Sequence, residues 1–190
     1  MALSARHIPN LISSIRILLV APLAVALARH RMTTALVMFA AAAASDAADG
    51  YLAKRFGWQS NLGAILDPIA DKLLLATVLI VLGFLGLVPL WLVAAAVARD
   101  AVIVAGAVSY RIFIGPLEAR PSRISKLNTL CQAAFILAVV GKVETGLPPA
   151  WLQVLLGALV FATVVVSGID YVLVYGRQAL QAARLGRGLQ

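Results

Sequence analysis

Six long runs of apolar residues constrain the fold of this 190-residue chain more than any other feature. A transmembrane α-helix needs about 20 mostly apolar residues. Hydrophobic residues make up 62% of the chain and charged residues 13%, whereas about 25% of the residues in soluble domains are charged. We therefore expect an all-α, polytopic membrane protein with six transmembrane helices. The expected spans are 9–28, 33–53, 62–85, 89–109, 125–141 and 150–175.

The segments between these spans are short, so we expect residues 1–190 to form a single transmembrane domain. The longest connection, 110–124, contains a glycine and two prolines, and we expect a short interfacial helix within it. The first apolar run carries Arg16 and Pro22 and lacks an evident cleavage site, which argues against a cleaved signal peptide. The single cysteine, Cys131, excludes a disulfide framework.

The basic residues predict the orientation in the membrane. Cytoplasmic loops of membrane proteins carry an excess of Lys and Arg. One set of span ends holds Arg6, Lys54, Arg55, Arg111, Arg120, Arg123, Lys126, Arg177, Arg184 and Arg187, and the other holds only Arg29, Arg31 and Lys142. We therefore expect both termini in the cytoplasm. On so apolar a chain, the net charge of +8 indicates anionic membrane lipids or phosphate-bearing substrates as partners and not nucleic acid.

The acidic residues lie where a membrane protein tolerates them least. Six of the eight are inside or at the ends of the expected spans: Asp46, Asp49, Asp67, Asp71, Asp100 and Asp170. A charge at mid-membrane costs roughly 2.5–3.5 kcal/mol on insertion scales. These carboxylates must therefore be shallow, paired or bound to cations, and they are candidates for a functional site.

Four of these acids are spaced to converge. Asp46 and Asp49 are three residues apart on one expected helix, and Asp67 and Asp71 are four apart on the next, so each pair shares a helix face. A short basic turn joins the two helices and places both pairs at a similar depth. Oxygen ligands favour Mg²⁺, Mn²⁺ or Ca²⁺. A pair of such ions commonly clamps a phosphodiester or pyrophosphate during displacement.

The pattern D-x2-D-G-x2-A-K-x8-G-x3-D-x3-D, from Asp46 to Asp71, resembles the motif of the CDP-alcohol phosphatidyltransferases, which are membrane enzymes of six helices. The opening Pro9-Asn10, followed by Arg16, extends the resemblance. One position departs from the family motif, which has Arg where this chain has Lys54. Lysine keeps the charge but lacks the bidentate fork of arginine.

The resemblance implies that two divalent cations, Mg²⁺ or Mn²⁺, bind Asp46, Asp49 and Asp67, with Asp71 as a further ligand. It also implies that Asp71 is the catalytic base for an acceptor hydroxyl. CDP-diacylglycerol would be the donor and CMP the leaving group. The implied CDP-binding residues are Asp49, Gly50, Ala53, Lys54 and Gly63. A homodimer in a bacterial inner membrane, with its active site facing the cytoplasm, is expected by the same resemblance.

A second set of polar residues is expected to bind the acceptor: Arg99, Arg120, Arg123, Lys126 and Asn128. The stretch I-S-K-L-N-T, at 124–129, is similar to the CMP-forming cardiolipin synthases of this family. Phosphatidylglycerophosphate synthases tend to carry a second Lys where this chain has Asn128. The resemblance therefore favours phosphatidylglycerol as acceptor, with glycerol-3-phosphate as the alternative.

Several interpretations stay open at this stage. A membrane cation or proton carrier is the alternative function from a different class, although carriers often show paired halves and no repeat is visible. Arg16 is expected either to contact phosphate or to pair with another helix. Asp170 is expected to be an interfacial anchor or the partner of Arg16. Because neighbouring residues of a helix point in different directions, we expect no ion pair between Arg99 and Asp100.

Overall fold

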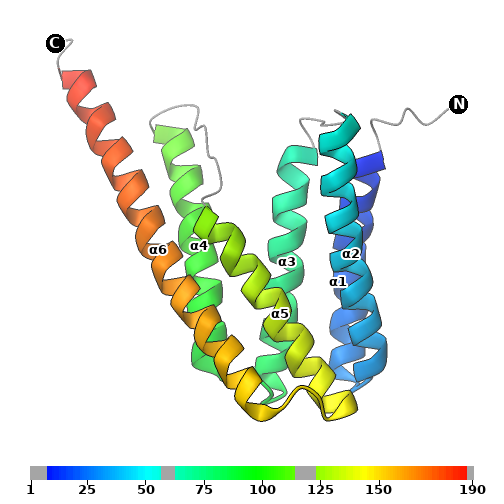
Figure 1. The fold of residues 1–190 in the computed structure, drawn as a ribbon. Helices are drawn as coiled ribbons and strands as arrows, with labels where there is room; N and C mark the ends of the chain where they lie inside the picture. Colours follow the sequence, from blue (N-terminus) through cyan, green and yellow to red (C-terminus); the bar gives the residue numbers. More distant parts are fainter. Residues whose placement is uncertain (1–7, 57–62, 114–122, 188–190) are drawn as a thin grey trace, which may run out of the picture.

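The computed structural model describes the backbone of residues 8–56, 63–113 and 123–187, and the side chains of 14–45, 70–106 and 124–174. The described residues form six α-helices and no strand: α1 (Ile8–Ala28), α2 (Met32–Phe56), α3 (Gly63–Phe84), α4 (Leu90–Phe113), α5 (Arg123–Thr145) and α6 (Ala150–Arg187). The helices alternate in direction, so α1 begins and α6 ends at the same end of the bundle (Figure 1). We refer to this end as the charged end.

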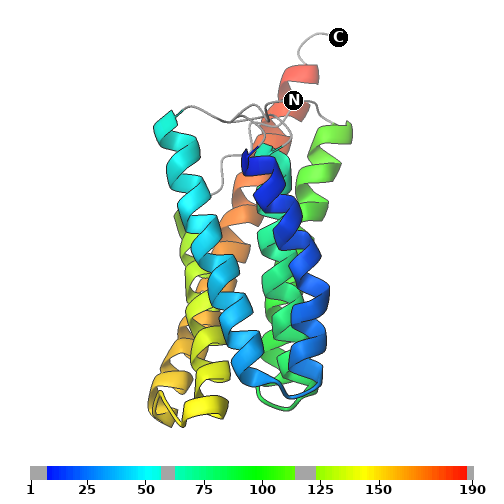
Figure 2. The same ribbon diagram turned by 90° about the vertical axis from the view of Figure 1, so that its right-hand side faces the viewer.

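The helices pack as a ring. Around it, α1 contacts α2, α2 contacts α5, α5 contacts α6, α6 contacts α4, α4 contacts α3, and α3 returns to α1. A further contact between α3 and α5 crosses the ring. Figure 2 shows from the side that the six helices lie roughly along one axis. The ring therefore brings α3 and α5 into contact, although they are distant in the sequence.

Three of the connections between helices are tight turns, and all three lie at the end opposite the charged end. Each turn contains one residue with a positive φ angle: His30 (54°), Gly86 (72°) and Gly146 (75°). After α1, the amide of Arg31 donates to the carbonyl of Ala26, which satisfies one of the helix's last carbonyls. Glycine adopts this left-handed conformation without steric cost, and histidine is among the residues that tolerate it.

The interior of the ring is mostly apolar, and so is much of its outside. Leu27, Leu82 and Ile136 are fully buried, whereas Val154 and Val172 of α6 are 72% and 60% exposed. By length and composition, Ile124–Thr145 and Ala150–Val174 could each cross a membrane, and Ser14–Ala28 and Met32–Ser45 are shorter apolar helices. An apolar outer surface of this extent suits a lipid environment.

The observed helices match the expected spans closely at most ends. The clearest difference is at α6, which continues to Arg187, and α4 and α5 each continue four residues beyond the expected span, to Phe113 and Thr145. The reason is physical: hydropathy falls where a chain leaves the apolar layer, but helical hydrogen bonding can continue beyond that point. The interfacial helix expected within 110–124 falls largely on residues 114–122, outside the described residues.

Candidate functional site

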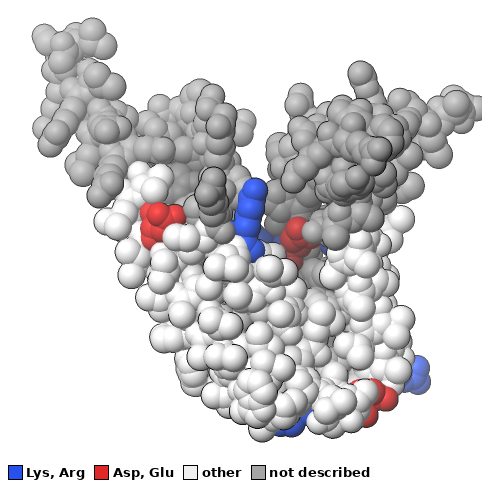
Figure 3. All heavy atoms as spheres, viewed as in Figure 1, with Lys and Arg blue, Asp and Glu red and all other residues white. Residues whose placement is uncertain are grey.

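Charged side chains within the described residues gather at two levels, separated by a broad uncharged band (Figure 3). The level opposite the charged end holds Arg29, Arg31, Lys142 and Glu144. The other level holds Arg16, Asp71, Lys72, Arg99, Asp100, Lys126 and Asp170. This second level contains, besides Lys72, the described charged residues that the sequence singles out, and it forms two polar clusters.

The first cluster is an ion pair between α1 and α3. Arg16 is buried, with 2% of its surface exposed, and its Nη1 donates to Oδ1 of Asp71 at 2.5 Å. Of the two roles expected for Arg16, the structure shows helix pairing. The expected pairing with Asp170 is wrong, because α1 packs against α2 and α3 and makes no contact with α6 among the described residues. Sequence reasoning did not identify Asp71 as the partner.

A cavity of about 270 Å³ opens beside this ion pair, between α1, α2, α3 and α5. Its polar lining residues are Arg16, Asp71, Lys126 and Thr129, and the others are apolar: Phe39, Ala42, Ala43, Leu74, Leu75, Leu130 and Ala133. The structure therefore brings together two residues predicted separately, the expected base Asp71 and the expected acceptor ligand Lys126. A carboxylate and two cationic groups around one cavity suit a phosphate-bearing substrate.

The second cluster surrounds Arg99, which is 6% exposed. Its Nη1 donates to Oδ1 of Asp100 at 2.5 Å, and its Nη2 donates to Oγ of Ser125 at 2.9 Å and to Oγ of Ser167. The centroid of the Tyr171 ring lies 5.9 Å from Cζ, the guanidinium carbon of Arg99. This arrangement links α4 to α5 and α6 through one buried side chain.

The ion pair between Arg99 and Asp100 overturns the expectation that these neighbours would not meet. Neighbouring Cβ atoms do point in different directions, but the long arginine stem lets the guanidinium group curl back to the next carboxylate. Lys72 of α3 also reaches Asp100, with Nζ 3.5 Å from the same Oδ1. Sequence reasoning missed this role of Lys72; the signal was a lysine within an apolar span, which needs a partner.

Asn128 lies in neither cluster. It is fully buried, and its Oδ1 accepts a hydrogen bond from Oγ1 of Thr163 on α6 at 3.0 Å. Gln132, one turn further along α5, is also buried. Of the residues expected to bind the acceptor, Lys126 thus lines the cavity, whereas Arg99 and Asn128 pack toward α6.

The remaining predicted residues have no described side chains. The backbone places Asp46, Asp49, Gly50, Ala53 and Lys54 on α2, Gly63 and Asp67 on α3, and Arg123 at the start of α5, whereas Arg120 lies outside the described residues. Among the side chains that are described, no group of three or more metal-binding residues occurs. Asp71 is the one member of the four-aspartate motif whose side chain is described.

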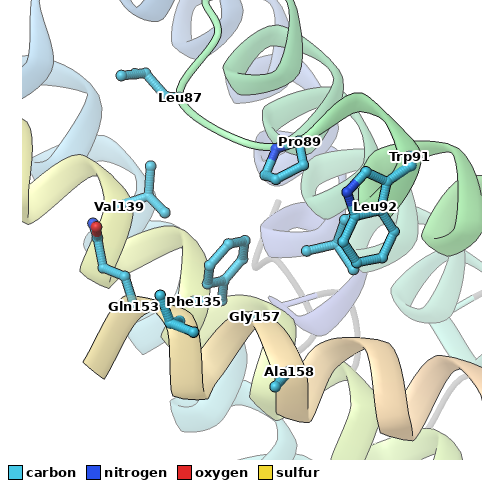
Figure 4. Close-up of a pocket in the computed structure, with 10 residues that line it drawn as sticks. Leu87, Pro89, Trp91, Leu92, Phe135, Val139, Gln153, Gly157 and Ala158 are labelled. Atoms are coloured by element: carbon cyan, nitrogen blue, oxygen red, sulfur yellow. The ribbon is translucent and has the colours of Figure 1, made fainter. Parts of the chain in front are cut away.

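A second cavity, of about 380 Å³, lies between α4, α5 and α6 near the opposite end (Figure 4). Its lining is apolar apart from Gln153, whose Nε2 donates to the carbonyl of Ala138 at 3.1 Å. Phe135 and Trp91 form part of the wall. Since no ionisable side chain lines this cavity, it lacks groups for acid–base or phosphate chemistry, and the candidate site is at the charged end.

Comparison with known proteins identifies the relatives of this chain. The profile of the family described as CDP-alcohol phosphatidyltransferase matches residues 6–167. The CMP-forming cardiolipin synthase of Rattus norvegicus is 32% identical over 194 residues, covering 93% of this chain and 64% of the relative. The "Probable phosphatidylglycerophosphate synthase" of Mycobacterium tuberculosis (strain ATCC 25618 / H37Rv) is 33% identical over 136 residues, covering 71% of this chain and 62% of the relative. The chain thus spans less than two thirds of the length of either relative.

Proposed function

This chain belongs to the CDP-alcohol phosphatidyltransferase family, and on that premise we propose that it transfers a phosphatidyl group from CDP-diacylglycerol to a hydroxyl acceptor, with release of CMP. The observation that carries the proposal is the position of Asp71. This last acid of the motif lines a cavity together with Lys126 and is held there by Arg16. A carboxylate at a cavity wall can accept the proton of an acceptor hydroxyl.

The same cavity is where the other three acids of the motif would act. Asp46 follows Ala42, a lining residue, by four positions on α2, and Asp67 precedes Asp71 by four positions on α3. Helical register therefore supports placing these residues one turn further along the faces that line the cavity. Asp49 follows Asp46 by three positions, on the same side of α2.

We propose that Asp46, Asp49, Asp67 and Asp71 bind two divalent cations. A donor set of carboxylate oxygens fits Mg²⁺ or Mn²⁺. When bound, such cations would neutralise the charge that develops on the leaving phosphate. The CDP moiety would lie over Gly50, Ala53 and Gly63, where small residues allow close approach, with Asp49 and Lys54 as further contacts.

Residues of the chain itself accept the proton and orient the groups that take part in the transfer. The acceptor oxygen forms a bond to the phosphatidyl phosphorus, and the bond from that phosphorus to the bridging oxygen breaks, so that this oxygen leaves with CMP. The hydroxyl proton moves to the carboxylate of Asp71. Arg16 fixes the orientation of that carboxylate, and Lys126 supplies positive charge to the substrate phosphate.

We further propose that all six helices span the membrane as one domain, with both termini and the charged end in the cytoplasm of a bacterial inner membrane. The uncharged band between the two charged levels supports this arrangement (Figure 3). A homodimer, which family resemblance suggests, is part of the proposal. The carrier alternative is less favoured, because the chain belongs to a family named for phosphatidyl transfer.

Phosphatidylglycerol is the acceptor that we favour, which would make cardiolipin the product. The relative from rat is named cardiolipin synthase (CMP-forming), and it aligns over 93% of this chain. Glycerol-3-phosphate remains the second candidate acceptor, because a relative over 71% of the chain is named as a phosphatidylglycerophosphate synthase.

A CMP-release assay on the purified full chain tests this proposal. CDP-diacylglycerol and Mg²⁺ are supplied with phosphatidylglycerol or with glycerol-3-phosphate, and Asp71→Asn serves as the inactive control. We expect CMP to be released with phosphatidylglycerol and not with glycerol-3-phosphate. The reverse result would make glycerol-3-phosphate the acceptor. No release of CMP with either acceptor would contradict the enzyme assignment.

A further inference from the structure

Arg99 and Asp100 of α4 are bonded to two of the helices that line the Asp71 cavity, although neither residue lines it. Oδ1 of Asp100 lies 3.5 Å from Nζ of Lys72 on α3. Nη2 of Arg99 donates to Oγ of Ser125 on α5 at 2.9 Å. The ion pair between Arg99 and Asp100, at 2.5 Å, joins these two contacts. We refer to the resulting chain of polar contacts, from Lys72 through α4 to Ser125, as the α4 bridge.

The two ends of the α4 bridge each stand next in the sequence to a residue of the cavity. Lys72 follows Asp71, the proposed base, and Ser125 precedes Lys126, the proposed phosphate ligand. The carbonyl of Ser125 also accepts a hydrogen bond from Oγ1 of Thr129, another lining residue, at 3.2 Å. Successive residues of a helix point about 100° apart. A bond at one of them therefore fixes the rotation of the helix about its axis, and with it the direction of its neighbour.

The arginine of the bridge reaches a helix against which α4 does not pack. Around the ring, α4 contacts α3 and α6, and the backbones of α4 and α5 make no contact among the described residues. The side chain of Arg99 is 4% exposed, and its planar guanidinium group has donors in fixed directions. Its bonds to Asp100, Ser125 and Ser167 therefore favour one placement of α4, α5 and α6 at this level.

We propose that Arg99 and Asp100 are positioning residues, which place the base and the phosphate ligand relative to one another; this role rests on the proposed function. The bridge has two arms. The α3 arm, from Asp100 to Lys72, fixes the helix that carries the base, whereas Arg16 holds the carboxylate of the base itself. The α5 arm, from Arg99 to Ser125, fixes the helix that carries the phosphate ligand.

Two serine variants test the α5 arm by steady-state kinetics. Ser125 and Ser167 are both buried, and both accept a hydrogen bond from Nη2 of Arg99. Only Ser125 belongs to a helix that lines the cavity. We expect Ser125→Ala to raise the KM for phosphatidylglycerol about tenfold with kcat unchanged, the effect of losing one charge-assisted hydrogen bond. Ser167→Ala, the matched control, should leave this KM unchanged.

Variants of Lys72 test the α3 arm in the same assay. Lys72→Met keeps most of the stem and removes the charge that reaches Asp100. We expect it to lower kcat about 10- to 100-fold with KM unchanged, because a small displacement of a catalytic group is costly. Lys72→Arg keeps the charge and should restore kcat. Lys142→Met, the same change at the opposite end of the bundle, should alter neither constant.

The placement of α3 and α5 can be measured without the reaction, by electron paramagnetic resonance on the full chain in nanodiscs. In a Cys131→Ser background, one pair of spin labels is attached at Leu73→Cys and Leu127→Cys, beside the two ends of the bridge. A second pair is attached at Phe84→Cys and Val143→Cys, toward the opposite ends of the same helices. All four positions are exposed. We expect the variants of both arms to broaden the distance distribution of the first pair and not of the second.

Equal effects of Ser125→Ala and Ser167→Ala on KM would overturn the proposal, and so would a failure of Lys72→Arg to restore kcat. Label distances that stay unchanged in the arm variants, or that broaden equally in both pairs, would also overturn it, because the bridge would then not act on the site in particular. The proposed enzymatic function fails separately: it is contradicted when the wild type releases no CMP with either acceptor, and the label distances still test the bridge.

Discussion

The ion pair between Arg16 and Asp71 offers a quantitative test of how α1 and α3 hold the site together. Arg16→Met removes the charge and keeps most of the apolar stem, and Asp71→Asn removes the carboxylate charge at nearly constant volume. Together with the double variant, these changes form a double-mutant cycle. The cycle isolates the energy of the pair from the effects of each substitution alone.

The structure sets the magnitude to be expected. The side chain of Arg16 is 3% exposed, whereas that of Asp71 is 30% exposed at the cavity wall. Breaking a fully buried ion pair costs about 3–5 kcal/mol, and an exposed pair is worth about 0–1 kcal/mol. Because one partner is buried and the other partly hydrated, we expect a coupling energy between these limits, about 1.5–3 kcal/mol, the range for hydrogen bonds to charged groups.

The assay is reversible unfolding of the purified protein in mixed detergent micelles, followed by circular dichroism. We expect each single variant to lower the free energy of unfolding and the double variant to lower it by less than the sum. Arg16→Lys should recover part of the loss, because it keeps the charge without the planar fork. If the loss in free energy of unfolding of the double variant equals the sum of the two single losses within about 0.5 kcal/mol, the pairing of these two side chains is refuted.

Three further predictions follow from the packing and the proposed chemistry. Gly83→Ala should destabilise the protein by about 1–3 kcal/mol in the same unfolding assay, because its Cβ would lie 2.9 Å from Cγ2 of Val93, whereas Gly106→Ala, with nothing within 4 Å, should not. Asp71→Asn should lower the rate of CMP release about 10²–10⁴-fold with donor binding retained, and Asp170→Asn should not; equal rates would remove the base role of Asp71. Chelation by EDTA should stop CMP release and added Mg²⁺ or Mn²⁺ should restore it, whereas activity that persists in EDTA would contradict metal dependence.

Much of the fold could be predicted from the sequence, because it depends on local properties of the chain. Apolar runs separated by short polar segments predict the helices, and the three turns opposite the charged end contain residues that tolerate a positive φ angle, such as Gly86 and Gly146. The end of α6 at Arg187 could not be predicted in this way. Hydropathy registers the edge of an apolar layer and not the last helical hydrogen bond.

The partners of the buried charges were harder to predict, because they depend on which helices pack together. Arg16 pairs with Asp71, 55 residues away, and not with Asp170, since α1 packs on α3 and not on α6. Lys72 reaches Asp100 for a similar reason, because α3 packs on α4. The sequence indicates that such charges need partners, but helix order around the ring decides which partners they find.

Chemical identification of the product tests the central claim most directly. The purified chain receives CDP-diacylglycerol and phosphatidylglycerol with distinguishable acyl chains, together with Mg²⁺, and lipids and nucleotides are analysed by mass spectrometry. We predict equal amounts of CMP and of a cardiolipin that carries the chains of both substrates. The absence of CMP and of any lipid that combines the two sets of chains would contradict the proposed transfer.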